Sequence, residues 1–127
     1  MPASLSILLS PRLLRSLFWL FAVAALAMAL MPVPPHLPID RFGDKAEHML
    51  AFGTLALVAN LAWRETSTAA IALRLSAFGA LIEVLQAIPA LHRDCDVRDW
   101  IADTVAIILA TLVARQLRRA LPEARDT

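Results

Sequence analysis

The stretch "LLRSLFWLFAVAALAMALM", residues 13–31, decides the fold class of this chain. It is apolar throughout except for an arginine and a serine in its first turn. A helix crosses the hydrocarbon core of a bilayer with about 20 such residues. The segment "PVPPHLP", residues 32–38, follows directly, and its prolines cannot continue a helix. The pattern therefore predicts a membrane-spanning helix that ends at Met31.

Three more apolar segments follow along the chain. Residues 47–63 are largely apolar after a charged first turn, and residues 69–91 are apolar apart from a few polar or charged positions. Residues 99–117 are largely apolar, with charges at Asp99, Asp103 and Arg115. The connections between the segments are short, and no second, soluble domain is evident. The sequence thus predicts an all-α fold with one domain, residues 1–127, that forms an integral membrane bundle of four transmembrane helices.

The composition agrees with a membrane protein and excludes several other classes. Of the 127 residues, 59% are hydrophobic and 18% are charged, whereas soluble domains average about 45–50% and 25%. A net charge of +1 excludes a strongly basic nucleic-acid binder, so no nucleic-acid partner is expected. Cys95 is the only cysteine, which excludes an internal disulfide and a cysteine-based zinc cluster.

The first segment has a second interpretation as a signal peptide. The triplet "AMA", residues 27–29, follows an apolar stretch with arginines before it, as at a signal-peptidase site. The apolar run is long for a signal peptide, which favours a retained membrane helix. Cleavage would leave three spans instead of four.

The basic residues orient the predicted bundle, because cytoplasmic ends of membrane helices carry an excess of Lys and Arg. Seven fall on the side that holds both termini and the middle connection, and four fall on the other side. The first set is Arg12, Arg15, Arg64, Arg115, Arg118, Arg119 and Arg125, and the second is Arg41, Lys45, Arg93 and Arg98. Both termini are therefore predicted to be cytoplasmic.

With this topology, polar residues from three separate segments reach the same outer level of the membrane. Helical spacing of three or four positions places each pair on one helix face, as for Glu83 with Gln86 and Asp99 with Asp103. We expect these residues to form one composite binding site. Its predicted members are Asp44, Lys45, His48, Glu83, Gln86, Arg93, Asp99 and Asp103.

Glu83 is the most demanding member of this set. An acidic residue near the middle of a membrane helix costs about 2.5–3.5 kcal/mol on insertion scales. Glu83 should therefore face the bundle interior, either protonated or paired with Lys45, His48 or Arg93. An ionisable residue inside a membrane is a functional-site hypothesis by default, and a structural ion pair is the competing explanation.

The same residues carry a resemblance to a known family. "DKAEH", residues 44–48, with Phe52 resembles the D-K-x-x-H-x-x-x-F opening of the VanZ-like membrane proteins, and "EVLQ", residues 83–86, matches their E-x-x-Q element. "RDCDVRDWIAD", residues 93–103, resembles their R-x(6)-D-x-x-x-N segment, with Asp103 where the family has Asn. Glycines of the family pattern are replaced by alanines at positions 106 and 110.

The resemblance implies a multi-pass protein of the bacterial inner membrane with a role at the cell envelope. The namesake of the family is associated with low-level resistance to the glycopeptide teicoplanin. A role at the cell envelope agrees with an outward-facing polar cluster, although family resemblance by itself is an analogy.

Three functions from different classes fit these residues. In the first, the outward-facing site binds the anionic head group of a membrane lipid or of a lipid-linked cell-wall precursor, with Lys45 and Arg93 on the phosphate. In the second, the protein is an enzyme in which Glu83 or Asp99 is a general base and His48 exchanges protons near neutral pH. In the third, the charges are a structural clasp between the last three helices, and the protein is an interaction module or has its function elsewhere. The sequence leaves open whether the chain forms a homo-oligomer.

The second function also has a less favoured form, in which the enzyme depends on a metal. It would use Asp44, His48, Glu83 and Asp99 as ligands, but no established ligand motif such as H-E-x-x-H is present. The sequence therefore predicts no metal and no cofactor, and it leaves open whether the chain is an enzyme.

Overall fold

The computed structural model describes residues 2–121 of the chain, and of Asp44 it describes only the backbone. Over these residues the fold is all-helical, with no strand. The α-helices are α1 (Ala3–Leu8), α2 (Pro11–Leu30), α3 (Asp44–Ala62), α4 (Thr68–Gln86) and α5 (Val97–Ala120). Two short 3-10 helices, η1 (Pro38–Phe42) and η2 (Pro89–Leu91), lie in the connections. The predicted all-α class is confirmed.

Each of the four predicted segments corresponds to a long helix, but the third ends before its expected boundary. The prediction extended this segment to residue 91, but α4 ends at Gln86. Pro89 is the reason, since the residue before a proline is pushed out of the helical region, and Ile88 has an extended ψ of 119°. The short helices α1, η1 and η2 were not predicted.

The predicted number of membrane spans is higher than the number supported by length and composition. Among the described residues, two helices are long and apolar enough to cross a membrane, α2 and α4. The helices α3 and α5 are long enough but not apolar enough. Their first two turns carry charges, such as Lys45 and Glu47 on α3 and Asp99 and Asp103 on α5. A signal sequence or a buried core helix can pass the same test.

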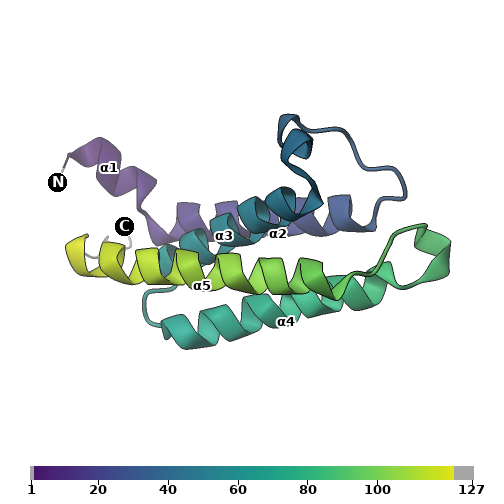
Figure 1. Cartoon of the computed structure of the whole chain (residues 1–127). Coiled ribbons are helices and arrows are strands. Elements are labelled where there is room, and N and C mark those ends of the chain that lie inside the picture. Colours follow the sequence, from purple (N-terminus) through teal and green to yellow (C-terminus); the bar gives the residue numbers. More distant parts are fainter. Residues whose placement is uncertain (1, 122–127) are drawn as a thin grey trace.

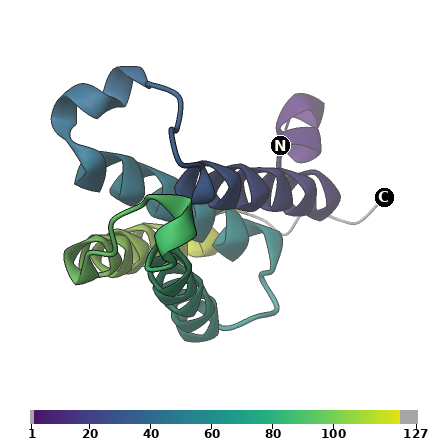
Figure 2. The same ribbon diagram turned by 90° about the vertical axis from the view of Figure 1, so that its right-hand side faces the viewer.

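Helix α3 occupies the centre of the bundle and contacts α2, α4 and α5 (Figures 1 and 2). Its buried face is built from small and apolar side chains, which allow neighbouring helices to approach closely. The core consists of Phe52, Leu55, Ala56 and Ala59 of α3 with Ala22 of α2, Ile71, Leu75 and Ile82 of α4, and Ile107 of α5.

Both ends of the described chain lie at one end of the bundle, together with the connection between α3 and α4 (Figure 1). The connections from α2 to α3 and from α4 to α5 lie at the opposite end. We call these the terminal end and the loop end.

Arginine side chains close the terminal end of the bundle. The last carbonyls of a helix have no partner within that helix. At the end of α3, Arg118 donates through Nε to Asn60 O at 2.7 Å and through a terminal nitrogen to Trp63 O at 2.9 Å. Arg118 also donates to Thr66 O at 3.1 Å, and Arg15 donates to Ala62 O at 3.2 Å. Two neighbouring helices thus cap the C-terminus of α3.

Replacing Arg118 with alanine should lower the free energy of unfolding by about 2–3 kcal/mol, because hydrogen bonds from a charged group are lost and helix-end carbonyls are left without partners. The measurement is denaturant unfolding of the purified protein in mild detergent, followed by circular dichroism. Arg119→Ala is the matched control, since Arg119 is exposed on the next position of the same helix. Equal stability of the two variants would contradict this capping role.

Candidate functional site

The loop end of α3 is shaped by the glycine that precedes it. Gly43 has φ of 90°, a conformation that glycine adopts without steric penalty, and it is the N-cap of α3. From there the helix begins with Asp44, whose side chain lies outside the described part of the structure, and Lys45. Lys45 and His48 consequently project from the first turns of α3 at the loop end.

The start of α5 brings carboxylates to the same place. Asp96 is the N-cap of α5, and its side chain accepts a hydrogen bond from the backbone N–H of Arg98 at 2.9 Å. This hydrogen bond is the main cause that lowers the pKa of the Asp96 carboxyl, with a smaller contribution from the charge of Lys45. Lys45 Nζ lies 3.1 Å from Asp99 Oδ1 and 3.6 Å from Asp96 Oδ2. An ion pair therefore joins the first turn of α3 to the first turn of α5.

His48 lies one turn deeper, between two carboxyl groups of α5. Its Nδ1 is 2.9 Å from Asp103 Oδ1, and its Nε2 is 3.6 Å from Asp99 Oδ2. The side chain of His48 is 16% exposed, whereas that of Asp103 is fully buried. Both nitrogens of the imidazole therefore face acidic groups.

Glu83 completes the cluster from α4. Its Oε2 accepts a hydrogen bond from the backbone N–H of Asp96 at 3.0 Å, and the residue is 6% exposed. The other oxygen, Oε1, is buried and has no hydrogen-bond partner within the described part of the chain, and the same holds for Asp103 Oδ2. We call His48, Glu83, Asp99 and Asp103 the acid–histidine cluster.

A glycine lets α4 approach α5 closely enough to build this cluster. A Cβ atom placed on Gly79 would lie 3.0 Å from Asp103 Oδ2. One turn earlier on α4, the carbonyl of Ser76 accepts a hydrogen bond from Trp100 Nε1 at 3.0 Å, and the hydroxyl of Ser76 bonds that of Thr104 at 2.9 Å. These polar contacts fix the register of the two helices around Asp103.

Gln86 and Arg93 hold the end of α2 in place. Gln86 Nε2 donates to Ala29 O at 3.0 Å, and a terminal nitrogen of Arg93 donates to Met31 O at 3.1 Å. Ala29 lies in the last turn of α2, and Met31 follows the helix directly. The carbonyls at this end have no partner within the helix. These two side chains therefore connect α4 and the loop after it to α2.

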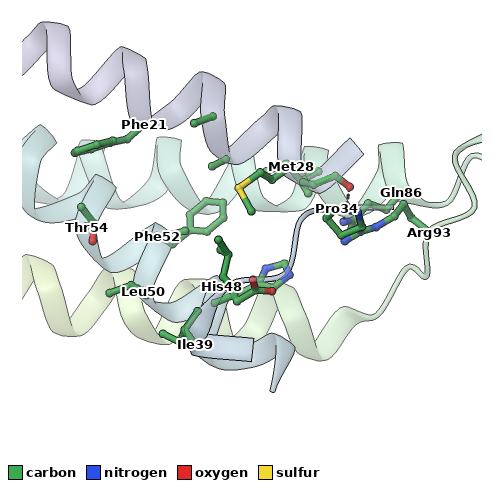
Figure 3. A pocket seen from close by; sticks show the side chains of 17 residues that line it. Phe21, Met28, Pro34, Ile39, His48, Leu50, Phe52, Thr54, Gln86 and Arg93 are labelled. Atoms are coloured by element: carbon green, nitrogen blue, oxygen red, sulfur yellow. Dashed lines mark hydrogen bonds between the residues drawn. The ribbon is translucent and has the colours of Figure 1, made fainter. Parts of the chain in front are cut away.

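A cavity of about 280 Å³ lies between α2, α3 and α4, next to the acid–histidine cluster. Figure 3 shows Phe21, Met28, Leu50 and Phe52 along its apolar walls, with Gln86 and Arg93 toward one end and His48 nearer the middle. His48 therefore belongs to both features, because it lines the cavity and takes part in the cluster.

Seven of the eight predicted site residues thus divide into two groups. Lys45, His48, Glu83, Asp99 and Asp103 lie together between α3, α4 and α5, while Gln86 and Arg93 lie at the cavity. The side chain of Asp44 is outside the described structure. Among the partners proposed for Glu83, Arg93 instead bonds the end of α2, because the loop after η2 carries it toward that helix.

Two residues of the site were not included in the prediction. Asp96 caps α5 and approaches Lys45, and an Asp just before an apolar helix is a recognisable N-cap signal. Gly79 has no side chain that could mark it as a site residue in the sequence, and its role depends on which helix packs against it.

Comparison with known proteins finds no relative of the chain. No protein-family model, no characterised protein and no solved structure matches the chain. The chemistry available is that of a partly buried imidazole among carboxyl groups, beside an apolar cavity with an arginine at its polar end.

Gly79→Ala should be less stable than Gly53→Ala by about 1–3 kcal/mol, the usual range for overpacking. The new methyl group meets Asp103 Oδ2 at 3.0 Å, and Asp103 is held by its bond to His48. A Cβ on Gly53 meets its nearest neighbour, Ala106, at 4.0 Å, and both variants gain the same helix propensity. Unfolding in mild detergent measures the difference. If Gly79→Ala matched Gly53→Ala, the tight contact with Asp103 would be refuted.

Proposed function

We propose that this protein is a multi-pass membrane protein that binds the anionic head group of a lipid at the loop end of its bundle. The observation that carries the proposal is the cavity between α2, α3 and α4, which has apolar walls and an arginine at its polar end. A lipid has the matching chemistry, an apolar chain joined to a phosphate.

The apolar outer surface supports four spanning helices. Within the apolar window of α2, only 11% of the residues are buried inside the protein. The exposed face of α5 carries large apolar side chains at helical spacing, and large exposed apolar patches mark membrane or protein contact sites. These side chains are Ile101, Val105, Ile108, Leu109, Leu112 and Val113. We infer that α3 and α5 also lie in the membrane, with their charged turns at the loop end.

The distribution of basic residues supports an orientation with both chain ends in the cytoplasm. Arg12, Arg64 and Arg115 are among the basic residues of the terminal end, and cytoplasmic membrane faces carry such an excess. The loop end and the acid–histidine cluster then face outward. The helix α2 is retained in this arrangement, since residues 29 and 31 accept hydrogen bonds from Gln86 and Arg93.

Arg93 is the group best placed to hold a phosphate. It is half-buried at the cavity and uses one terminal nitrogen on Met31 O, so other N–H groups of its guanidinium are available for bidentate contact. Lys45 was expected to share this role, but its ammonium lies between Asp96 and Asp99. The cavity of about 280 Å³ is near the lower limit of ligand pockets, about 300–1,000 Å³, and takes part of a lipid chain.

The VanZ-like resemblance narrows the class of lipid. Of the residues that carry it, His48 and Glu83 belong to the acid–histidine cluster, and Arg93 lines the cavity. A lipid-linked cell-wall precursor in the bacterial inner membrane, with its phosphate on Arg93, is the ligand that this resemblance favours.

A structural clasp is the second candidate function, and the contacts of Lys45 favour it. Ion pairs from Lys45 to Asp99 and from His48 to Asp103 already join α3 to α5. In this case the cluster stabilises the bundle, and the double variant Lys45→Ala with Asp99→Ala should show coupled effects on stability.

Arg93→Ala should reduce retention of phosphatidylglycerol about tenfold or more, as expected when a hydrogen bond to a charged group is lost. The measurement is native mass spectrometry of the purified protein, released from detergent in the presence of phosphatidylglycerol or phosphatidylcholine. Arg98→Ala is the matched control, because the Arg98 side chain is 79% exposed at the same end of the bundle.

A second variant tests the apolar part of the cavity. Ala25 lines it, and Ala25→Trp should fill it and lower retention of both lipids. Equal retention of phosphatidylglycerol by the Arg93→Ala and Arg98→Ala variants would contradict the head-group role of Arg93.

Cys95 provides a test of the orientation. It is exposed in the connection before α5, so a membrane-impermeant maleimide should label it in cells whose outer membrane alone is permeabilised. For comparison, Glu65→Cys in a Cys95→Ser background places the thiol at the terminal end, and this variant should react only after the inner membrane is opened. The reverse pattern would overturn the outward-facing site.

A further inference from the structure

Three helices bring metal-ligating atoms together at one point inside the bundle. His48 comes from α3, Glu83 from α4 and Asp103 from α5, and each offers one ligand atom within 4.8 Å of the others. Glu83 and Asp103 are 6% and 0% exposed. Such a convergence of nitrogen and oxygen donors needs an explanation, because ionisable groups are rarely buried without a partner.

The internal contacts do not satisfy this group. Glu83 Oε1 and Asp103 Oδ2 are buried, and within the described residues neither has a hydrogen-bond partner. Leaving a buried charged acceptor without a partner is more unfavourable than leaving a neutral one, so each such group in a native protein calls for an explanation such as an ion. The two oxygens belong to two of the three residues whose ligand atoms converge.

The balance of charge at the cluster also favours a cation. Three carboxyl groups, those of Glu83, Asp99 and Asp103, lie around the imidazole of His48. Lys45 is paired with Asp99, which lies nearer the surface. Within the part of the chain that the structure describes, Glu83 and Asp103 each use one carboxylate oxygen in a hydrogen bond.

We propose that His48, Glu83 and Asp103 bind a divalent transition-metal ion, with Zn²⁺ as the preferred ion. One imidazole and two carboxylates form a mixed nitrogen and oxygen ligand set, which Zn²⁺ accepts at about 2.0–2.2 Å. Ca²⁺ and Mg²⁺ prefer sites made of oxygen alone, so the imidazole argues against them. The ligand atoms of the three residues already lie within 4.8 Å of one another, and binding of one ion brings them closer together. This reverses the expectation from the sequence that the chain holds no metal.

The surrounding structure limits how the ligands can move. Gly79 leaves the space into which Asp103 Oδ2 points, and the backbone N–H of Asp96 orients Glu83 through its other oxygen. Asp99 Oδ2, at 3.6 Å from His48 Nε2, is close enough to serve as a further oxygen ligand or to orient the imidazole. The ligands therefore come from rigid helices and have contacts that position them.

Zn²⁺ binding to the full chain, purified without a histidine tag, tests the proposal directly. The protein is stripped with a chelator in mild detergent, dialysed, and titrated calorimetrically with ZnCl₂ in the absence of added lipid. We expect one Zn²⁺ per chain. The variants Glu83→Gln and Asp103→Asn keep the shape of each side chain, and each should weaken binding by about tenfold or more.

Two controls separate this site from adventitious binding. His36 and His92 are exposed, so the double variant His36→Ala with His92→Ala should bind Zn²⁺ as the native chain does. Asp40→Asn removes an acid outside the cluster and should also leave binding unchanged. Substitution by Co²⁺ adds a spectroscopic readout, since its visible absorption should change in the Asp103→Asn variant.

Stability measurements cover variants that fold poorly. Zn²⁺ should raise the unfolding temperature of the native chain and of the double histidine variant, because a ligand that binds the folded state stabilises it. It should not do so for Glu83→Gln or Asp103→Asn. Absence of Zn²⁺ binding by the folded native chain, or unchanged affinity in both acid variants, would overturn the metal site. Neither result bears on lipid retention, which is measured separately.

Discussion

Close packing of α4 against α5 is the constraint on which the candidate site depends. The two helices meet where Gly79 faces Asp103, and a methyl group there would already lie 3.0 Å from the carboxylate. Helix α3 reaches the same carboxylate through His48, whose Nδ1 lies 2.9 Å from Asp103 Oδ1. Small residues are what permit this proximity, since helices in apolar surroundings associate through close backbone approach and interhelical polar contacts.

The two ends of the bundle meet the same physical requirement with opposite chemistry. Helix ends leave backbone groups without partners, and an apolar environment makes this unfavourable. At the terminal end, Arg15 and Arg118 donate to the carbonyls that end α3. At the loop end, carboxylates of Glu83 and Asp96 accept from the N–H groups that begin α5. As a result, the terminal end carries arginines, and the loop end carries carboxyl groups and a histidine.

The loop end combines two features that share one side chain. The acid–histidine cluster is suited to a cation, and the cavity with Arg93 is suited to an anion. His48 lines the cavity and contacts Asp103, so a change in its position affects both. The cluster therefore contributes both to the stability of the bundle and to the proposed binding chemistry.

The sequence by itself determined the all-α class, the four long helices and the faces that carry Glu83 and Asp103, because apolar runs, prolines and helical spacing are local properties. It overestimated the length of the third helix, where Pro89 was passed over, and it counted four spans where length and composition support two. Only the tertiary structure decided which polar residues meet. It paired Lys45 with Asp99 and directed Arg93 to the end of α2, and it left one oxygen each of Glu83 and Asp103 without a hydrogen-bond partner among the described residues. These outcomes depend on the rotation and separation of packed helices, which the spacing along one helix does not specify.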